Sequence, residues 1–197
     1  MFNSAVGSEV GKVTSFQMIG SRRLWLAGIC SALLAGCAGT PPAPKFSHDM
    51  VSDSRVAATD TAEVTIEVAE HIEVLPGDRD RVAQKIKARI DARKLTNTAS
   101  NEPRAFQVVL RVTRYEKGNR FARAMLAGLG QIHLEGTISV YQMPAHTLVE
   151  EFDMHKTFAW GGIYGASTSM EEIEDTFADS VAATVTGQAH PVPKAKS

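Results

Sequence analysis

Residues 131–158 read "QIHLEGTISVYQMPAHTLVEEFDMHKTF", two segments of alternating apolar and polar residues around a short turn. In the first segment, apolar residues occupy alternate positions: Ile132, Leu134, Ile138 and Val140. The second segment places Leu148, Phe152 and Met154 on one face, and Glu150 is an exception to the pattern. A period of two is typical of half-buried strands. The stretch therefore predicts an antiparallel hairpin with one face in the core.

The turn of this hairpin sets which residues face each other. We expect a three-residue turn at 144–146 that pairs Met143 with Thr147, because this register matches the apolar faces of the two strands. It also predicts three polar pairs on the other face: His133 opposite Thr157, Glu135 opposite His155, and Thr137 opposite Asp153. Polar side chains thus gather on the face that lies away from the core.

Four of these polar residues form a possible site: His133, Glu135, Asp153 and His155. Two imidazoles and two carboxylates suit a divalent metal such as zinc, or acid–base chemistry. A solvated polar face with weak cross-strand charge pairs accounts for the same residues. We favour the polar face, so no metal is predicted, and we keep a metal-binding or hydrolytic site as the alternative.

Outside the hairpin, periodicity predicts the remaining elements. They are a strand over 63–70, a helix over 78–95 capped by Asp78, a strand over 104–118, a short helix within 118–131, a glycine loop at 161–167 and a helix over 169–187. The short helix carries Phe121, Met125 and Leu129 at helical spacing. Ser169 and Glu172 form a capping-box pattern at the start of the last helix.

This order of elements, β-α-β-(short α)-β-β-α, predicts the fold class. Four half-buried strands and two long amphipathic helices indicate an α/β (α+β) two-layer sandwich, with a mixed four-stranded sheet and both main helices on one face. The strand over 63–70 is expected at an edge of the sheet, where it can pair with a strand of a partner.

The N-terminal part of the chain resembles a targeting signal. Residues 21–23 are a short basic segment, and residues 24–35 form an apolar stretch too short to span a bilayer. Residues 34–37, Leu-Ala-Gly-Cys, resemble the lipobox of bacterial lipoproteins. The resemblance implies cleavage between Gly36 and Cys37 and acylation of Cys37 with lipid such as palmitate, which anchors the chain in a membrane.

The lipobox also implies a location and a division of the chain. The residue after the cysteine is Ala38 rather than Asp. In lipoproteins of Gram-negative bacteria this resembles the default signal for export to the outer membrane. We therefore expect a lipid-anchored protein on the periplasmic side of that membrane. The predicted segments are an extension at 1–17 (translation starting at Met18), a signal peptide at 18–36, a flexible tether at 37–60, a domain at 61–187 and a disordered tail at 188–197.

Composition and motifs limit the function. The 21 basic and 22 acidic residues give a net charge of -1, which argues against nucleic acid as a partner. The glycines fit no dinucleotide or phosphate-loop spacing, and no nucleophile elbow is present, so we predict neither a cofactor nor an enzyme. Trp160, Gly161, Gly162 and Tyr164 are candidates for an exposed binding loop, with aromatic packing against the last helix as the alternative.

A family resemblance adds to this interpretation. The stretch "RYEKGNRFARAMLAGLGQIHLEGTISVY" from Arg114, the hairpin, "WGGIYGAS" at 160–167 and the closing helix resemble a family of bacterial lipoproteins catalogued as domain of unknown function 4410. The resemblance covers residues 61–187 and the lipobox, and it departs at the turn 143–146, where the family has Thr-Gly. It implies an envelope location and a compact domain, but no activity. We expect a binding or assembly role with an unknown envelope protein or as a homo-oligomer.

Overall fold

The computed structural model describes residues 42–48, 55–100, 102–126 and 129–188. In chain order the elements are β1 (Lys45–His48), β2 (Thr61–Val68), α2 (Pro76–Lys94), β3 (Ala105–Glu116), α3 (Arg120–Met125), β4 (Ile132–Met143), β5 (Thr147–Phe158), α4 (Gly162–Ser167) and α5 (Met170–Val185). The predicted signal peptide, Cys37 and the tail beyond Gln188 lie outside the described residues.

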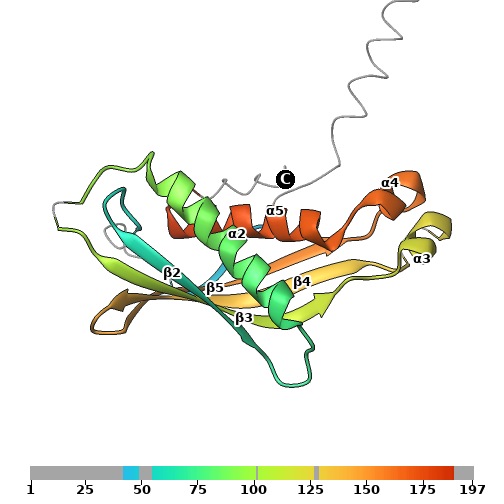
Figure 1. The fold of residues 1–197 in the computed structure, drawn as a ribbon, viewed down its shortest axis with the longest axis horizontal. Helices are drawn as coiled ribbons and strands as arrows, with labels where there is room; N and C mark the ends of the chain where they lie inside the picture. Colours follow the sequence, from blue (N-terminus) through green and yellow to red (C-terminus); the bar gives the residue numbers. More distant parts are fainter. Residues whose placement is uncertain (1–41, 49–54, 101, 127–128, 189–197) are drawn as a thin grey trace, which may run out of the picture. The chain divides into compact units, whose positions relative to one another are not determined.

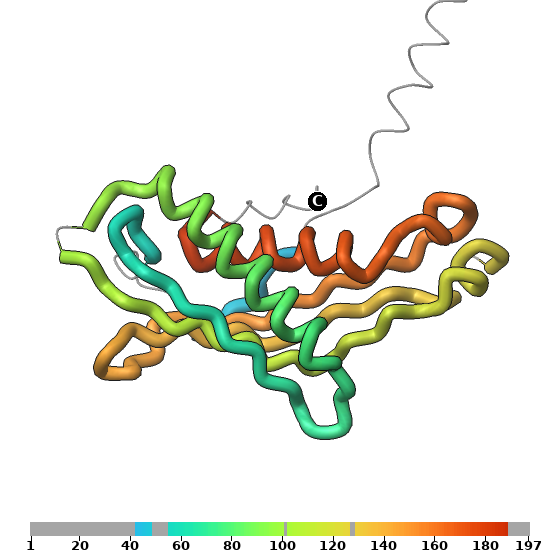
Figure 2. Tube along the Cα trace, viewed as in Figure 1, coloured from blue at the N-terminus to red at the C-terminus, as the bar shows by residue number. Residues whose placement is uncertain are grey.

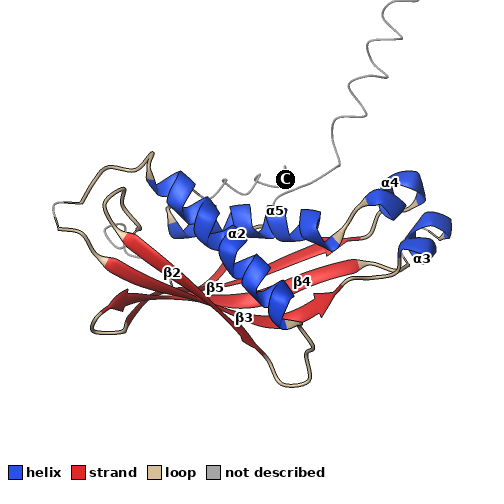
Figure 3. Ribbon diagram, in the orientation of Figure 1, coloured by secondary structure: helices blue, strands red, loops and turns tan. Residues whose placement is uncertain are grey.

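The strands form one mixed sheet in the order β1-β5-β4-β3-β2 (Figure 3). β2 and β3 are parallel and are joined by α2, whereas the other neighbouring strands are antiparallel. The predicted α+β class is confirmed, but the sheet has five strands among the described residues, not four. The strand that the prediction missed is β1, whose four residues are all exposed. A segment so short and so exposed carries no hydrophobic period that a sequence could reveal.

The hairpin of β4 and β5 has the predicted register along most of its length. His133 faces Thr157, Glu135 faces His155 and Thr137 faces Asp153. Next to the turn the pairing differs, because Gln142 rather than Met143 lies opposite Thr147 and a bulge between Val140 and Tyr141 restores the register. An extra residue in one strand adds twist without changing the faces farther along.

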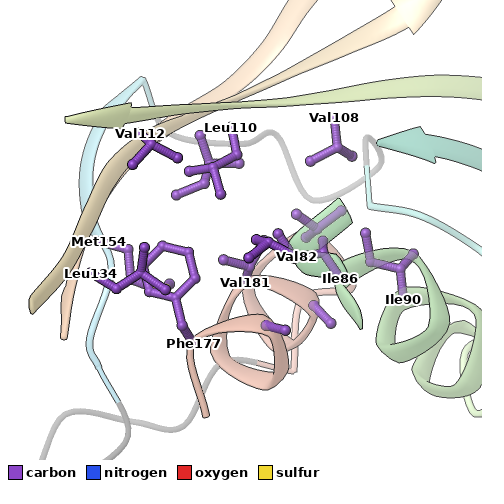
Figure 4. Close-up of a cluster of buried hydrophobic side chains, with 14 of the residues drawn as sticks. Val82, Ile86, Ile90, Val108, Leu110, Val112, Leu134, Met154, Phe177 and Val181 are labelled. Carbon is purple, nitrogen blue, oxygen red and sulfur yellow. The ribbon is translucent and has the colours of Figure 1, made fainter. Parts of the chain in front are cut away.

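Helices α2 and α5 lie across one face of the sheet and pack against each other (Figures 1 and 2). Both helices present apolar residues at four-residue intervals toward the sheet. Figure 4 shows the resulting core, in which residues from both helices meet the strands: Val82, Ile86, Ile90, Phe177 and Val181 against Val108, Leu110, Val112, Leu134 and Met154. The predicted placement of both main helices on one face is thus confirmed.

The helix ends agree with the sequence at α5 and differ at α2. The Ser169 hydroxyl accepts a hydrogen bond from the Glu172 amide, and the Glu172 carboxylate accepts one from the Ser169 amide, so the capping box is present. Asp78, in contrast, is not a cap. The helix begins earlier, at Pro76, because proline fits the first helical turn, and Asp78 lies inside that turn.

The segment predicted as a glycine loop contains a helix, α4. Gly162 has a φ of +74° at its start, and Gly165 lies so close to the Trp160 carbonyl that a Cβ atom there would collide with it. Glycine therefore permits a tight helical turn at this point. Among the described residues, no helix has both the length and the apolar character needed to cross a membrane.

Candidate functional site

The polar face of the hairpin brings three of its four candidate residues together. The His155 Nδ1 lies 3.2 Å from a Glu135 carboxylate oxygen, and the His133 Nδ1 lies 3.8 Å from the other oxygen of Glu135. Asp153 is held elsewhere, since it accepts a hydrogen bond of 2.7 Å from the Thr137 hydroxyl. His133 itself contacts the Thr157 hydroxyl at 3.0 Å. The cross-strand neighbours predicted from the register are therefore engaged mainly with one another.

These contacts do not build a metal site. Within the described ranges, no group of three or more His, Cys, Asp or Glu side chains is arranged to hold a metal ion. Arg114 also reaches this face, 3.4 Å from Glu135 and 2.9 Å from Glu116. Its hydrogen bond holds the pKa of the Glu116 carboxyl below its usual value. The geometry is that of a polar sheet surface with cross-strand ion pairs.

A buried ionic network, which no pattern in the sequence indicated, joins α2, α5 and β3. Glu174 is 0% exposed, and its two oxygens each accept a 2.8 Å hydrogen bond from Arg81. The Tyr115 hydroxyl donates to the same carboxylate at 2.7 Å, and the Lys85 ammonium lies 3.3 Å away. Burial and the contact with Glu174 raise the pKa of Tyr115 well above its usual value. The phenol therefore stays protonated and serves as a hydrogen-bond donor.

Asp78 extends this network toward the loop after β3. Its oxygens lie 2.7 Å from Arg81 and 2.8 Å from the Lys117 ammonium, and these contacts lower its pKa, Lys117 having the largest effect. Both carboxylates of the network thus face at least one cation. Charges paired in this way suit a structural role, because a buried carboxylate without a cation would be costly.

A second surface lies at the opposite end of the sheet from the hairpin turn, where α3 and α4 pack against each other (Figure 1). We call it the apolar tip and define it by its exposed large side chains: Phe121, Met125, Leu126, Leu129, Trp160, Ile163 and Tyr164. Ile163 is 92% exposed and Phe121 is 71% exposed. Exposed apolar groups gathered in one place mark binding surfaces, whereas scattered ones need no explanation.

The sequence indicated part of this tip as a binding loop and gave no indication that the short helix before it is exposed. Trp160, Gly162 and Tyr164 of the predicted binding loop are exposed, and Gly161 is partly exposed. The Tyr164 ring lies 5.8 Å from the ring of Phe158, at the end of β5. Helical spacing of Phe121, Met125 and Leu129 predicted one or two turns of helix, and α3 is present but ends at Met125, before Leu129. All three side chains are exposed.

Arg123 fixes the two halves of the tip to each other. It is 1% exposed, and its guanidinium donates to the carbonyl oxygens of Gly130 and Gly165 at 2.7 Å each and of Thr168 at 3.1 Å. Burial lowers the pKa of this group, and Arg120 lowers it further. An arginine that lies between helices and donates to backbone carbonyls makes the exposed side chains part of a rigid surface rather than of a mobile loop.

The chain is similar to several solved structures. The chain is similar to a variant of PelC from Paraburkholderia phytofirmans, a dodecamer, with a TM-score of 0.50 and 10% identity over 76% of this chain and 99% of that one. It is also similar to protein XCC0632 from Xanthomonas campestris (TM-score 0.45, 14% identity, 74% and 95% covered). A minor lipoprotein from Acinetobacter baumannii gives a TM-score of 0.36 with 14% identity over 66% and 94% of the chains. No protein of curated function matches the sequence.

The architecture defines a mixed α+β domain in which two helices cover one face of a single sheet and leave the other face polar. The chain belongs to the family described as Domain of unknown function (DUF4410), whose model matches residues 48–162. The expectation drawn from the sequence resemblance is thereby confirmed. The match begins at His48, the last residue of β1, includes β2 to β5, and ends at Gly162, the first residue of α4.

Proposed function

We propose that this protein is a lipid-anchored lipoprotein of the outer membrane whose periplasmic domain has a binding or assembly role and catalyses no reaction. The lipobox at residues 34–37 supports the anchor, with Cys37 as the acylated residue and Gly36–Cys37 as the cleaved bond. The signal peptide is taken as 18–36, preceded by an extension at 1–17. In this proposal the segment 37–60 follows the anchor, with β1 and the residues from Val56 onward packed on the domain, and 188–197 is a tail.

The apolar tip is the observation that carries the binding role. Seven large apolar or aromatic side chains are exposed on α3, α4 and the residues beside them, and Arg123 joins the two helices. Such a surface is costly in water unless something covers it, and its rigidity lowers the entropy lost on binding. The buried carboxylate of Glu174, in contrast, is engaged by groups of two other elements, with an ion pair to Arg81 and a hydrogen bond from Tyr115.

A homo-oligomer is one form that an assembly role can take. PelC, which resembles this chain in fold, forms a dodecamer. The edge strand β2 offers a second route, because none of the described strands lies on its outer side in the sheet order. An unknown envelope protein is the alternative partner for either surface.

Metabolic labelling with radioactive palmitate tests the anchor. The wild-type chain is expected to incorporate label and to sediment with outer membranes, whereas the Cys37→Ser variant incorporates none. Absence of label on the wild type would refute both the anchor and the location. Cross-linking in intact cells then tests the role: an adduct of higher mass is expected, and a monomer under all conditions would contradict assembly with a protein.

A further inference from the structure

We infer that the apolar tip inserts into the surface of an anionic lipid membrane and so provides a second attachment, beside the lipid on Cys37, that orients the domain. This inference deepens the proposed function and rests on it for the presence of a nearby membrane. It commits to lipid as the occupant of the tip, rather than to a second copy of the chain or to another protein.

The chemistry of the tip fits a membrane interface. Trp160 and Tyr164 are residues of the kind that concentrate at the level of lipid headgroups. Ile163 and Phe121 add exposed apolar side chains to the same tip. Surfaces that lie in the interface combine such an apolar face with basic residues. A protein partner, in contrast, is expected to supply polar groups around the rim, with charges of either sign.

The charge of the tip is of one sign. Residues 117–130 contain Lys117, Arg120 and Arg123 and no acidic residue, and residues 159–169 contain no charged residue at all. Arg120 is exposed at the start of α3. Lys117 is paired with Asp78 and Arg123 is buried, so Arg120 is the basic residue of the tip that faces water. A basic residue near an anionic bilayer adds attraction that acts over about 10 Å. A second copy of the same tip would bring like charges together, which disfavours a symmetric tip-to-tip contact.

The direction of β1 places its N-terminal end on the side of the sheet where the tip lies. β1 is antiparallel to β5, with Lys45 opposite Asp153 and His48 opposite Glu151, so the chain enters β1 from the side on which β5 ends. Trp160 follows just after that end. The chain N-terminal to Lys45 therefore approaches from the side of the tip.

Chain length allows the anchor and the tip to meet one membrane. Cys37 is eight residues before Lys45, and eight residues span at most roughly 26–29 Å. From Asp153 to Trp160 the distance is about 23 Å along an extended strand. The segment is therefore long enough for a lipid on Cys37 and the tip to contact the same bilayer.

Tryptophan fluorescence gives a direct test, because the chain has two tryptophans and one of them, Trp25, is in the proposed signal peptide. All proteins carry Trp25→Phe, so that Trp160 is the sole reporter whether or not the signal is removed. The purified full chain is reconstituted in vesicles of phosphatidylethanolamine and phosphatidylglycerol, with or without brominated phosphatidylcholine. Emission, its quenching by bromine, and its protection from acrylamide are measured, and acylation is determined by mass spectrometry.

We expect the Trp160 emission to shift to shorter wavelength in vesicles and to lose most of its intensity to brominated lipid. Ile163→Asp removes apolar carbons from the tip. Each buried carbon contributes a factor of roughly four to the partition coefficient between lipid and water. The affinity of the tip for lipid should therefore fall on the order of 100-fold, and the quenching should be lost. Leu95→Asp is the matched control, since Leu95 is 71% exposed and lies at the C-terminal end of α2, away from the tip. It should leave quenching unchanged, and the melting temperatures of both variants should match the parent.

Separate outcomes refute the tip and the anchor. An acylated chain that floats with the vesicles while Trp160 stays unquenched would overturn the inference and leave the anchor intact. A chain without acyl groups whose Trp160 is still quenched by brominated lipid would support the tip and refute the anchor. Protection of Trp160 from acrylamide in the vesicles, without quenching by brominated lipid, would show that a second copy or a protein covers the tip, and would also overturn the inference.

Discussion

Replacement of Arg123 by methionine tests the account of how the tip is held together. Methionine has a similar reach and is apolar, so it fills the space but donates no hydrogen bond. The substitution leaves the carbonyl oxygens of Gly130, Gly165 and Thr168 without the guanidinium that now lies 2.7–3.1 Å from them. Gly165 and Thr168 are themselves buried, so water cannot replace the donor without movement of the backbone.

The expected loss is about 3 kcal/mol in the free energy of unfolding. A buried acceptor left unpaired costs roughly 1–3 kcal/mol, and two are affected, at Gly165 and Thr168. The Gly130 oxygen still accepts a hydrogen bond of 3.1 Å from the Asn119 amide. Burial of the Arg123 charge itself costs free energy, as its lowered pKa reflects. Removal of that charge therefore offsets part of the loss from the unpaired acceptors. If α3 and α4 come apart at a lower cost than this, the loss is limited to the free energy of that local opening.

Two measurements distinguish these cases. Urea denaturation gives the global free energy of unfolding, and amide hydrogen exchange gives the local opening of residues 120–126 and 162–168. We expect faster exchange in both segments, while the sheet keeps its protection. Arg120→Met is the matched control, because it removes an exposed arginine from the same helix and should change stability by less than about 0.5 kcal/mol. A change below about 1 kcal/mol for Arg123→Met, with exchange at 162–168 unaltered, would refute the reasoning.

Two further predictions concern the buried carboxylates. Glu174→Gln keeps the shape of the side chain but removes the charge that pairs with Arg81, so the free energy of unfolding in urea should fall by about 3 kcal/mol. The control Asp175→Asn changes a half-exposed side chain and should cost less than about 1 kcal/mol. Equal losses for the two variants would contradict the network. For Asp60, burial alone raises the pKa, but hydrogen bonds from Arg104, the Ala57 amide and other donors lower it below its usual 3.8 overall. The unfolded chain therefore binds the proton more readily than the folded one. The contribution of Asp60 to the stability of the fold is present above about pH 4 and is lost as the pH falls through the lower folded pKa. Identical pH profiles of stability for wild type and Asp60→Asn would argue against this contribution.

The sequence contained the information for most of the secondary structure. Strong alternation in the hairpin and four-residue spacing in α2 and α5 require one face of each element to be buried, so their positions and the register of His133 to Thr157 could be predicted. The capping pattern at Ser169 and Glu172 is equally local. These features depend on contacts between residues that are near in sequence, or on a period that only one pairing satisfies.

Features that depend on distant residues were not predictable in this way. β1 is too short to have a period, and it forms a strand because β5 offers it an open edge. Glu174 and Arg81 are far apart in the sequence and meet only when α2 and α5 cross the sheet. The bulge beside the turn, which places Gln142 rather than Met143 opposite Thr147, depends on the twist of the whole hairpin.

The candidate surfaces show the same division. The sequence alone indicated the lipobox-like motif at Cys37, the polar face of the hairpin and the candidate loop at Trp160, because each is a contiguous or strictly periodic pattern. The tertiary structure decided that Phe121 and Met125 are exposed on α3. Their spacing did not determine this, because the position of α3 depends on the buried Arg123, whose partners Gly165 and Thr168 lie 42 and 45 residues farther along the chain.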